Sequence, residues 1–234
     1  MIFYTCITNG YDKLPQVYID PEVRYVCFHD GSIELEGPWE FIELEYEHDC
    51  PVRRSYHPKH CPHLYFDEGE YVIWIDGSYD ITKELIDFSK INKLDFVLQS
   101  HPDQRSLLGE FKKLYGNGFS TADEIMSMAN KIKNTGFKLY DYDQTINSVI
   151  WRRLTPDVIE WCKTWRKWYM DGVNRDQISS NVAEYLTIKA HRVPLQVQMT
   201  GGTRQKSYGE SYTLHPKGGK IMNELLHIFL EWHE

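Results

Sequence analysis

An aspartate stands at the end of one of the most apolar runs in the sequence. The run Val72–Ile75 leads directly into Asp76, which is followed by Gly77 and Ser78. A carboxylate at the end of a rigid, buried strand can bind a hard divalent cation that holds phosphate oxygens, and the Ser78 hydroxyl could be a further ligand. The same pattern is typical of an Asp-Gly turn, or of a cap for a helix near Ile81. Spacing alone leaves these interpretations open.

Basic side chains gather ahead of that strand, in PVRRSYHPKHCPH, residues 51–63. Arg53, Arg54 and Lys59 could neutralise a pyrophosphate, because guanidinium and ammonium groups pair well with phosphate oxygens. The alternative is a solvated basic loop. The stretch also contains residue types that bind zinc, although neither a CxxC pair nor another usual ligand spacing is present. These residues are Cys50, His57, His60, Cys61 and His63.

An acid and an amide stand side by side in NRDQISSN, residues 174–181. Asp176 could act as a base toward an acceptor hydroxyl or position it, with Gln177 beside it, and Arg175 could orient an acid. The structural alternative is a helix N-terminus, where Asn174 or Asp176 is the cap and an acid lies near the positive end of the helix dipole. The residues alone do not separate the two.

Three further side chains are candidates for contacts with a phosphate, a sugar or a metal. His101 and Arg105 are four residues apart, a spacing that places both on one face of a helix. His215 precedes a Gly- and Lys-containing segment, residues 216–220, which could close over a metal-bound diphosphate. The alternatives are an exposed pair and a mobile loop.

Elements that could position these side chains follow from the apolar periodicity. The expected strands are Ile2–Thr8, Arg24–His29, Trp39–Leu44, Tyr71–Ile75 and 148–153. Polar residues and a glycine follow the first, second and fourth of them at once, and in open α/β sheets ligands bind outside the carboxyl ends of the strands. The sequence therefore predicts that these strand ends line one edge of one site.

Helices are expected between and after these strands, with N-terminal signals at several of them. Thr82 and Thr155 are expected caps, and Thr121 with Glu124 forms a capping box. We expect an α/β fold with a mixed sheet and one domain. Residues 1–200 would form its body, and residues 201–234 a loop and a closing helix packed on it. The expected helices are Ile81–Lys90, Gln104–Tyr115, Thr121–Asn134, Pro156–Tyr169, Asp176–Tyr185 and Ile221–Trp232.

The overall composition limits the class of protein. The chain has 234 residues, 41% of them hydrophobic, and a net charge of −8, which argues against a large nucleic-acid footprint. No apolar run approaches membrane-spanning length, and the N-terminus lacks the pattern of a signal peptide. Five cysteines without such a signal predict reduced thiols and a cytoplasmic location. We take a monomer as the default.

Several motifs in fixed order resemble one family. They are YTCITNGYD (4–12), VCFHD (26–30), RRSYHPKHCPHLYF (53–66), EYVIWIDGS (70–78), the His101/Arg105 pair, NSVIWRR (147–153) and NRDQISS (174–180). The set resembles the glycosyltransferase-like domain of plant Golgi, bacterial and viral proteins, long listed as a domain of unknown function. The resemblance covers roughly residues 1–185. It implies a GT-A fold, a Rossmann-like α/β domain that binds a nucleotide-diphospho-sugar, usually together with Mn²⁺ or Mg²⁺.

The resemblance also implies roles for individual residues. Asp76 would stand where GT-A enzymes carry the metal-binding Asp-x-Asp, although Ser78 replaces the second carboxylate, and His215 would be a further metal ligand. Asp176 and Gln177 resemble the acid–amide pair near the acceptor in glycogenin-like transferases. The implied donor-site residues are Thr8, Asn9, Gly10 and Tyr11 in a nucleotide-binding loop, Asp30 near base or ribose, and Arg54 and Lys59 near the diphosphate, with His101 and Arg105 as further contacts.

The predicted function is transfer of a sugar from a nucleotide-diphospho-sugar, UDP-linked, to a hydroxyl of a glycan or small acceptor. Asp176 would be the base if the reaction inverts the anomeric centre, and would only orient the substrate if it retains it. A non-catalytic module that binds nucleotide or glycan is the first alternative. A zinc-stabilised structural domain built on residues 50–63 is the second.

Overall fold

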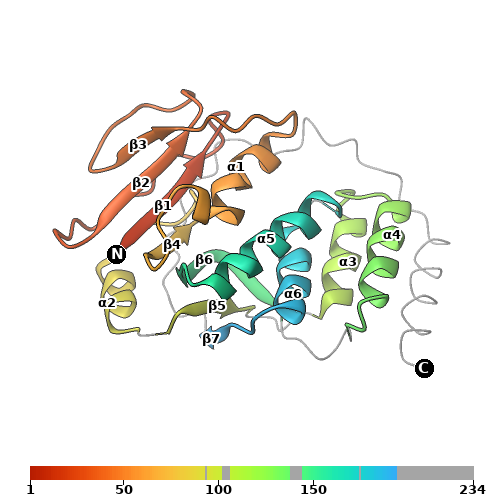
Figure 1. Ribbon diagram of the computed structural model, residues 1–234. Coiled ribbons are helices and arrows are strands. Elements are labelled where there is room, and N and C mark those ends of the chain that lie inside the picture. The colour runs from red at the N-terminus through yellow and green to blue at the C-terminus, as the bar shows by residue number, and fades with distance from the viewer. Residues whose placement is uncertain (93, 102–105, 138–143, 174, 194–234) are drawn as a thin grey trace.

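Seven strands form one mixed sheet in the order β3-β2-β1-β4-β6-β5-β7 (Figure 1). This structure is a computed structural model, and it describes residues 1–92, 94–101, 106–137, 144–173 and 175–193. β1 to β4 run parallel, whereas β6 is antiparallel to both of its neighbours, β4 and β5. The strands are β1 Ile2–Ile7, β2 Arg24–His29, β3 Glu40–Glu43, β4 Tyr71–Ile75, β5 Phe96–Ser100, β6 Thr145–Arg153 and β7 His191–Val193.

Helices cover both faces of this sheet, so the predicted α/β architecture with a flanked mixed sheet is confirmed. α5 and α6 pack against each other along one face, and α3 and α4 lie beside α6 at the end remote from β3 (Figure 1). The helices are α1 Pro51–His60, α2 Lys83–Ile91, α3 Leu107–Gly116, α4 Ala122–Lys133, α5 Pro156–Met170 and α6 Asp176–Leu186, with a short 3₁₀ helix at Pro62–Leu64.

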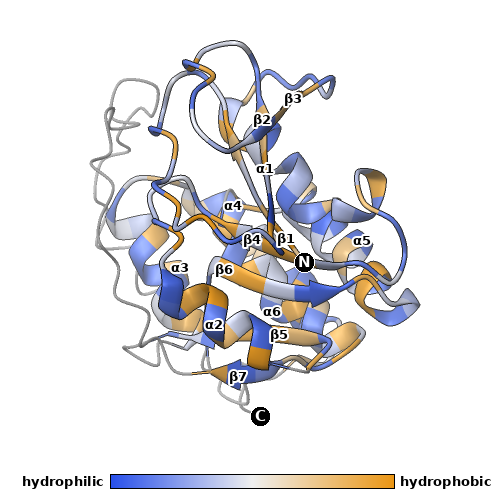
Figure 2. Ribbon diagram, turned by 90° about the vertical axis from the view of Figure 1, so that its left-hand side faces the viewer, coloured by the Kyte–Doolittle hydropathy of each residue, from blue (hydrophilic) through white to orange (hydrophobic). Residues whose placement is uncertain are grey.

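Alternate residues of the strands feed two separate cores, as expected for a sheet covered on both faces. On one face Tyr4 and Trp74 pack with Trp161 and Trp165 of α5. The opposite face packs against α2, whose apolar stretches lie next to β5 and β6 in Figure 2. A third apolar cluster joins α3, α4 and α6. The sheet is therefore a rigid support for whatever follows its strand ends.

The strand ends that carry polar residues meet at one edge, because β1, β2, β4 and β5 all run in the same direction. The chain passes from β1 outward to β2 and β3, and then returns to the other side of β1 as β4. The pairing of β1 with β4 ends at Tyr4 and Trp74, before either strand ends. Such a reversal of strand order is the usual ligand-binding position in open α/β sheets.

Most of the predicted elements are present, with ends shifted by a few residues. The caps at Thr82 and Thr155 and the capping box of Thr121 and Glu124 are confirmed. Because Thr82 caps α2, Asp76 is not the cap of that helix. The expected helix Ile221–Trp232 lies outside the described residues. Within those residues no helix is long and apolar enough to cross a membrane.

Residues 51–63 are not the basic loop of the sequence interpretation. They form α1 and the short 3₁₀ helix that follows it. Pro51 occupies the first turn, where its missing N–H costs nothing, and Pro58 lies in the last turn. Packing of α1 against β1 and α5 outweighs its polar composition. β5 and β7 were not predicted.

Candidate functional site

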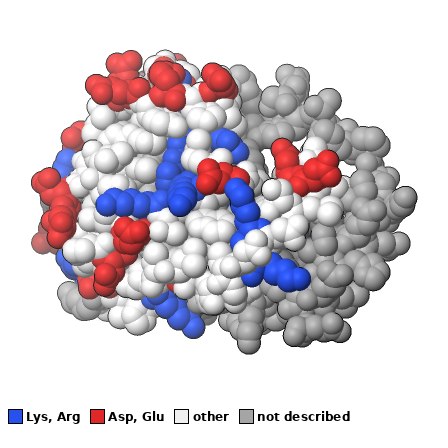
Figure 3. Space-filling view, turned by 45° about the vertical axis from the view of Figure 1, so that its right-hand side comes forward, with Lys and Arg blue, Asp and Glu red and all other residues white. Residues whose placement is uncertain are grey.

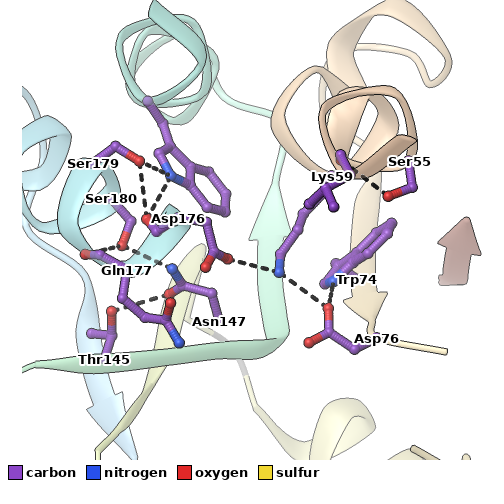
Figure 4. Close-up of polar contacts among 12 residues, drawn as sticks. Ser55, Lys59, Trp74, Asp76, Thr145, Asn147, Asp176, Gln177, Ser179 and Ser180 are labelled. Carbon is purple, nitrogen blue, oxygen red and sulfur yellow. Dashed lines mark hydrogen bonds and ion pairs between the residues drawn. The ribbon is translucent and has the colours of Figure 1, made fainter. Parts of the chain in front are cut away.

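A buried lysine joins the two aspartates singled out from the sequence. The Lys59 ammonium lies 3.1 Å from Oδ1 of Asp76 and 2.9 Å from Oδ2 of Asp176 (Figure 4). The two carboxylates come from distant parts of the chain, the end of β4 and the first turn of α6. Their meeting at one ammonium confirms no role by itself, but it places both at the same point of the fold.

The three members of this cluster differ in their access to solvent. The side chain of Lys59 is 1% exposed and that of Asp176 is 7% exposed, whereas Asp76 is 26% exposed. A ligand at this edge of the sheet would therefore meet Asp76 first. The lysine is enclosed further by aromatic rings, since its ammonium lies 4.5 Å from the Tyr56 ring centroid and 5.5 Å from that of Trp74.

Two further side chains hold the cluster in place. The fully buried Arg152 of β6 donates a hydrogen bond of 2.8 Å to the backbone carbonyl of Lys59, at the C-terminal end of α1. Its other terminal nitrogen donates to the Tyr4 hydroxyl. The Trp74 indole donates to Oδ1 of Asp76 over 2.7 Å. Both the backbone that carries the lysine and the carboxylate that it meets are thus fixed by hydrogen bonds.

The charges of the cluster stabilise one another. Burial alone would lower the pKa of Lys59, but its attraction to Asp176 and Asp76 outweighs burial and raises that pKa. Burial alone would raise the pKa of Asp176, but Lys59, Arg175 and the Asn147 amide together lower it. Both ions therefore stay charged at neutral pH, as a hydrogen-bonded buried pair requires.

The start of α6 is held by hydrogen bonds from neighbouring elements. The Trp165 indole of α5 donates to the Asp176 carbonyl at 3.0 Å and to the Ser179 hydroxyl at 3.1 Å. Asn147, near the start of β6, donates to the Ser180 hydroxyl at 2.9 Å (Figure 4). Asp176 is the first helical residue rather than the cap, and Arg175 stands at the cap position without a side-chain capping bond.

The neighbours of Asp176 face different surroundings. Arg175 makes an ion pair of 2.8 Å with the buried Glu110 of α3, so it braces α6 against α3 rather than orienting the aspartate. The buried Oε1 atom of Gln177 has no hydrogen-bond partner in the part of the chain that the structure describes. An unsatisfied buried amide oxygen is costly unless a ligand or water supplies a donor, so Gln177 is a candidate contact for a hydroxyl group.

The predicted nucleotide-binding loop is fixed to the end of β2. Asn9 and Gly10 both have positive φ, 58° and 56°, and they turn the chain after β1. The Asn9 N–H donates to Oδ2 of Asp30 at 2.8 Å, and the Gly10 N–H donates to the Ser32 hydroxyl at 2.7 Å. The Thr8 carbonyl accepts from the Tyr11 N–H. The turn after β1, residues 8–11, is thus held by hydrogen bonds to the turn after β2, which contains Asp30.

Hydrogen bonds stabilise the ionised form of Asp30. Burial raises its pKa, but the Ser32 hydroxyl and the backbone N–H groups of Asn9 and Ser32 lower it by more, with help from Arg54. Arg54 lies 3.6 Å from Asp30 and also binds the Tyr46 carbonyl and Glu47. The arginine therefore lies beside the predicted nucleotide loop, and its contact with a diphosphate stays a prediction.

Gly77 allows the chain after β1 to approach the chain after β4. A Cβ atom on Gly77 would lie 2.9 Å from Cβ of Asp12 and 3.0 Å from its Oδ2. The missing side chain of Gly77 thus leaves room for Asp12, so a second carboxylate borders the Asp76 turn. Asp12 belongs to the YTCITNGYD motif, but its sequence context predicts no role for it.

We expect Gly77→Ala to lower the free energy of unfolding by about 1–3 kcal/mol, because the added methyl group overlaps Asp12. Urea denaturation measures this change. The matched control is Gly116→Ala at the end of α3, where an added Cβ meets nothing within 4 Å, and its stability should be unchanged or rise by up to about 1 kcal/mol. Equal stability of the Gly77 variant and the wild type would show that the turn tolerates the methyl group.

The remaining predicted residues do not join this cluster in the described structure. His101 is buried just beyond β5, where its N–H donates to the Gln144 carbonyl, and it is not on a helix because α3 begins at Leu107. Ser78 lies in the turn after Asp76. Arg105 and His215 lie outside the described residues.

The described residues do not form the zinc site that was considered for residues 50–63. Within the described ranges, no group of three or more His, Cys, Asp or Glu side chains could hold a metal ion. His57 binds the Tyr65 hydroxyl and stacks on Tyr46, and burial lowers its pKa to about 4. His60 is packed against Trp165, and burial raises the pKa of the Cys61 thiol to about 11. His60 and Cys61 are buried side chains, and His57 is half-buried against Tyr46.

The described side chains around Asp76 do not fit a divalent cation either. Its Oδ1 already accepts hydrogen bonds from Lys59 and Trp74, and Ser78 supplies no carboxylate. Even with Asp12 counted, the described residues provide no group of three His, Cys, Asp or Glu side chains that could hold a metal ion. A metal on Asp76 would lie about 4 Å from the ammonium, where two unit charges repel by roughly 4 kcal/mol at an effective dielectric constant of about 20, and a divalent ion doubles that. The predicted ligand His215 lies outside the described residues.

The arrangement can bind a polar ligand and act on a hydroxyl group. Figure 3 shows Lys and Arg side chains around acidic groups in the middle of one face, with further acidic groups along its margin. Asp176 is an ionised carboxylate held in one orientation, which a base or a hydroxyl-positioning group requires. Sequence reasoning missed Trp74, Asn147 and Arg152 as supports. The sequence offered one indication of this supporting role, namely that each is a residue able to form hydrogen bonds within an otherwise apolar strand.

Comparison with protein families and with curated protein sequences gives no match. Among solved structures, the chain is similar to the galactosyltransferase LgtC in complex with donor and acceptor sugar analogs, with a TM-score of 0.44 and 10% identity over 82% of this chain and 73% of that chain. It is likewise similar to an active-site mutant of LgtC, with a TM-score of 0.43 and 9% identity over 83% of this chain and 72% of that chain.

Proposed function

We propose that this protein transfers a sugar from a nucleotide-diphospho-sugar to a hydroxyl of a glycan or another acceptor. One observation carries the proposal. Asp76 and Asp176 converge on Lys59 at the carboxyl edge of the parallel strands, where the strand order reverses. Fixed carboxylates at such an edge suit a reaction between a phosphate-bearing donor and a hydroxyl-bearing acceptor.

The donor side of the proposed site consists of the turns after β1 and β2. Asn9 and Gly10 are held by Asp30 and Ser32, so this surface is preformed and binding a nucleotide there need not order it. Arg54, beside Asp30, supplies positive charge for a diphosphate. We propose a UDP-linked donor. Lys59 would not contact the donor directly, because it is buried between Asp76 and Asp176; it would act by holding these two carboxylates in place.

The acceptor side consists of the start of α6. The ionised Asp176 would accept a proton from the acceptor hydroxyl if the reaction inverts the anomeric centre, and would orient that hydroxyl if it retains it. The Gln177 Oε1 atom, which has no hydrogen-bond partner among the described residues, would accept a hydrogen bond from a second hydroxyl of the acceptor. Arg175 takes no direct part, because it is paired with Glu110.

A divalent cation would supply charge neutralisation on the leaving diphosphate, and Mn²⁺ or Mg²⁺ was expected at Asp76. The described donor set does not fit such an ion, so no step is assigned to it. The cytoplasmic location, the monomeric state and the division at residue 200 stay predictions.

Thermal denaturation with a panel of nucleoside diphosphates and nucleotide sugars tests the proposal. A ligand that binds the native state at 100 times its dissociation constant stabilises it by about 2.7 kcal/mol, so the true donor should raise the melting temperature above all others. Asp30→Ala should weaken this shift, because Asp30 holds the Asn9 turn. The control Glu43→Gln, at the end of β3, should leave it unchanged. A panel without any shift for the wild type contradicts the proposal.

A further inference from the structure

We propose that Lys59 is the resident cation of this site, where it holds Asp76 and Asp176 in place of a divalent metal ion. The site would then bind its diphosphate-bearing ligand without metal. The second statement rests on the proposed function. The first does not, because it concerns only which cation lies between the two carboxylates.

The geometry is that of a cation with two carboxylate partners. One ammonium nitrogen lies 3.1 Å and 2.9 Å from oxygens of the two aspartates, and both contacts are hydrogen bonds. Mg²⁺ and similar ions in phosphate sites typically bind one or two carboxylates and take their other ligands from water and phosphate. The ammonium thus occupies the position between two carboxylates that such an ion would need.

The lysine cannot readily leave this position. Its backbone carbonyl is bound by Arg152, which is fully buried. Its ammonium lies near the faces of Tyr56 and Trp74, and the side chain is 1% exposed. Solvent therefore offers no ready alternative partner, and withdrawal would leave two carboxylates facing each other without a counter-charge.

Lys59 reduces the negative charge of the two carboxylates from two to one, and the positive charge for a diphosphate would come from Arg54 beside Asp30. Two uncompensated carboxylates would repel a diphosphate, whereas the ammonium cancels one of the two negative charges. The more exposed Asp76 then meets the ligand with its charge partly neutralised by Lys59. Lys59 touches no substrate in this scheme and is a positioning residue.

Manganese binding to the metal-free protein tests this inference without any donor. Electron paramagnetic resonance measures free Mn²⁺ in titrations of the wild type, of Lys59→Met and of Lys59→Met combined with Asp76→Asn. The wild type should show no stoichiometric site. Lys59→Met should bind one Mn²⁺ at least ten-fold more tightly, because the two carboxylates then lack a cation, and the double variant should lose that site. Lys59→Arg, which keeps the charge, should behave as the wild type does.

Two results overturn the inference. One is stoichiometric Mn²⁺ binding by the wild type that Asp76→Asn abolishes, and this measurement stands even if Lys59→Met does not fold. The other is a folded Lys59→Met protein that binds Mn²⁺ no better than the wild type. Should the protein bind no nucleotide at all, the proposed function fails and the manganese titrations still decide the role of Lys59.

Discussion

If the protein transfers sugar as proposed, we expect Asp176→Asn to lower the turnover number by about 10²- to 10⁴-fold, the usual contribution of a general base or acid. Asparagine keeps the size of the side chain but cannot accept a proton at neutral pH. The helix start should persist, because Trp165 binds the backbone carbonyl of residue 176. The buried Lys59 loses the charge of one of its two carboxylate partners, so the free energy of unfolding of this variant is measured beside its kinetics. The affinity for the donor should change little, since the donor turns lie after β1 and β2. Steady-state kinetics with separate determination of donor affinity measures both quantities.

The control for this substitution is Asp123→Asn, which removes an exposed carboxylate from the first turn of α4. Its turnover number should equal that of the wild type, which excludes a general effect of lost negative charge. If Asp176→Asn transfers sugar at the wild-type rate, the carboxylate belongs to the structure and not to the reaction.

Trp165→Ala lowers the free energy of unfolding by about 3–5 kcal/mol, the range for removal of a large aromatic side chain from a core. Trp165 is fully buried, its ring centroid lies 4.7 Å from that of Trp161, and its indole holds the start of α6. The substitution leaves a cavity and also frees the Asp176 carbonyl from its donor. Urea denaturation measures the loss.

Two variants separate packing from the hydrogen bond. Trp165→Phe keeps most of the ring but removes the indole N–H, and should cost about 1–3 kcal/mol because the buried carbonyl loses its donor. Trp168→Ala, on the same helix at a half-buried position, should cost less than Trp165→Ala. A loss at Trp168 equal to that at Trp165 would show that α5 as a whole, and not this contact, sets the stability.

Much of the fold could be predicted because its local signals agree with its tertiary contacts. The strands Arg24–His29 and Tyr71–Ile75 have the expected bounds, and Thr121 and Glu124 form the expected capping box. α1 could not be predicted in this way. Its three cations, two histidines and two prolines indicate a loop, and only packing against β1 and α5 makes it a helix.

The site was predictable in its residue types but not in its pairings. Asp76, Asp176 and Lys59 were each singled out from the sequence, but with three separate roles. Their hydrogen bonds join residues 17 and 117 positions apart, and no local pattern encodes such contacts. Likewise, Asp12 lies against Gly77, and these two residues are 65 positions apart in the sequence. Which side chains contact each other in this site depends on how α1, β4 and α6 pack together.

Release of free nucleoside diphosphate, measured over a panel of nucleotide sugars with and without acceptor sugars, tests the central claim most directly. We predict that one UDP-linked donor yields UDP at a rate that rises with acceptor concentration, and that Asp176→Asn removes this dependence while the donor still binds. If the folded wild-type protein binds the donor but releases no diphosphate with any acceptor, the claim of sugar transfer is contradicted and the chain is a nucleotide-binding module.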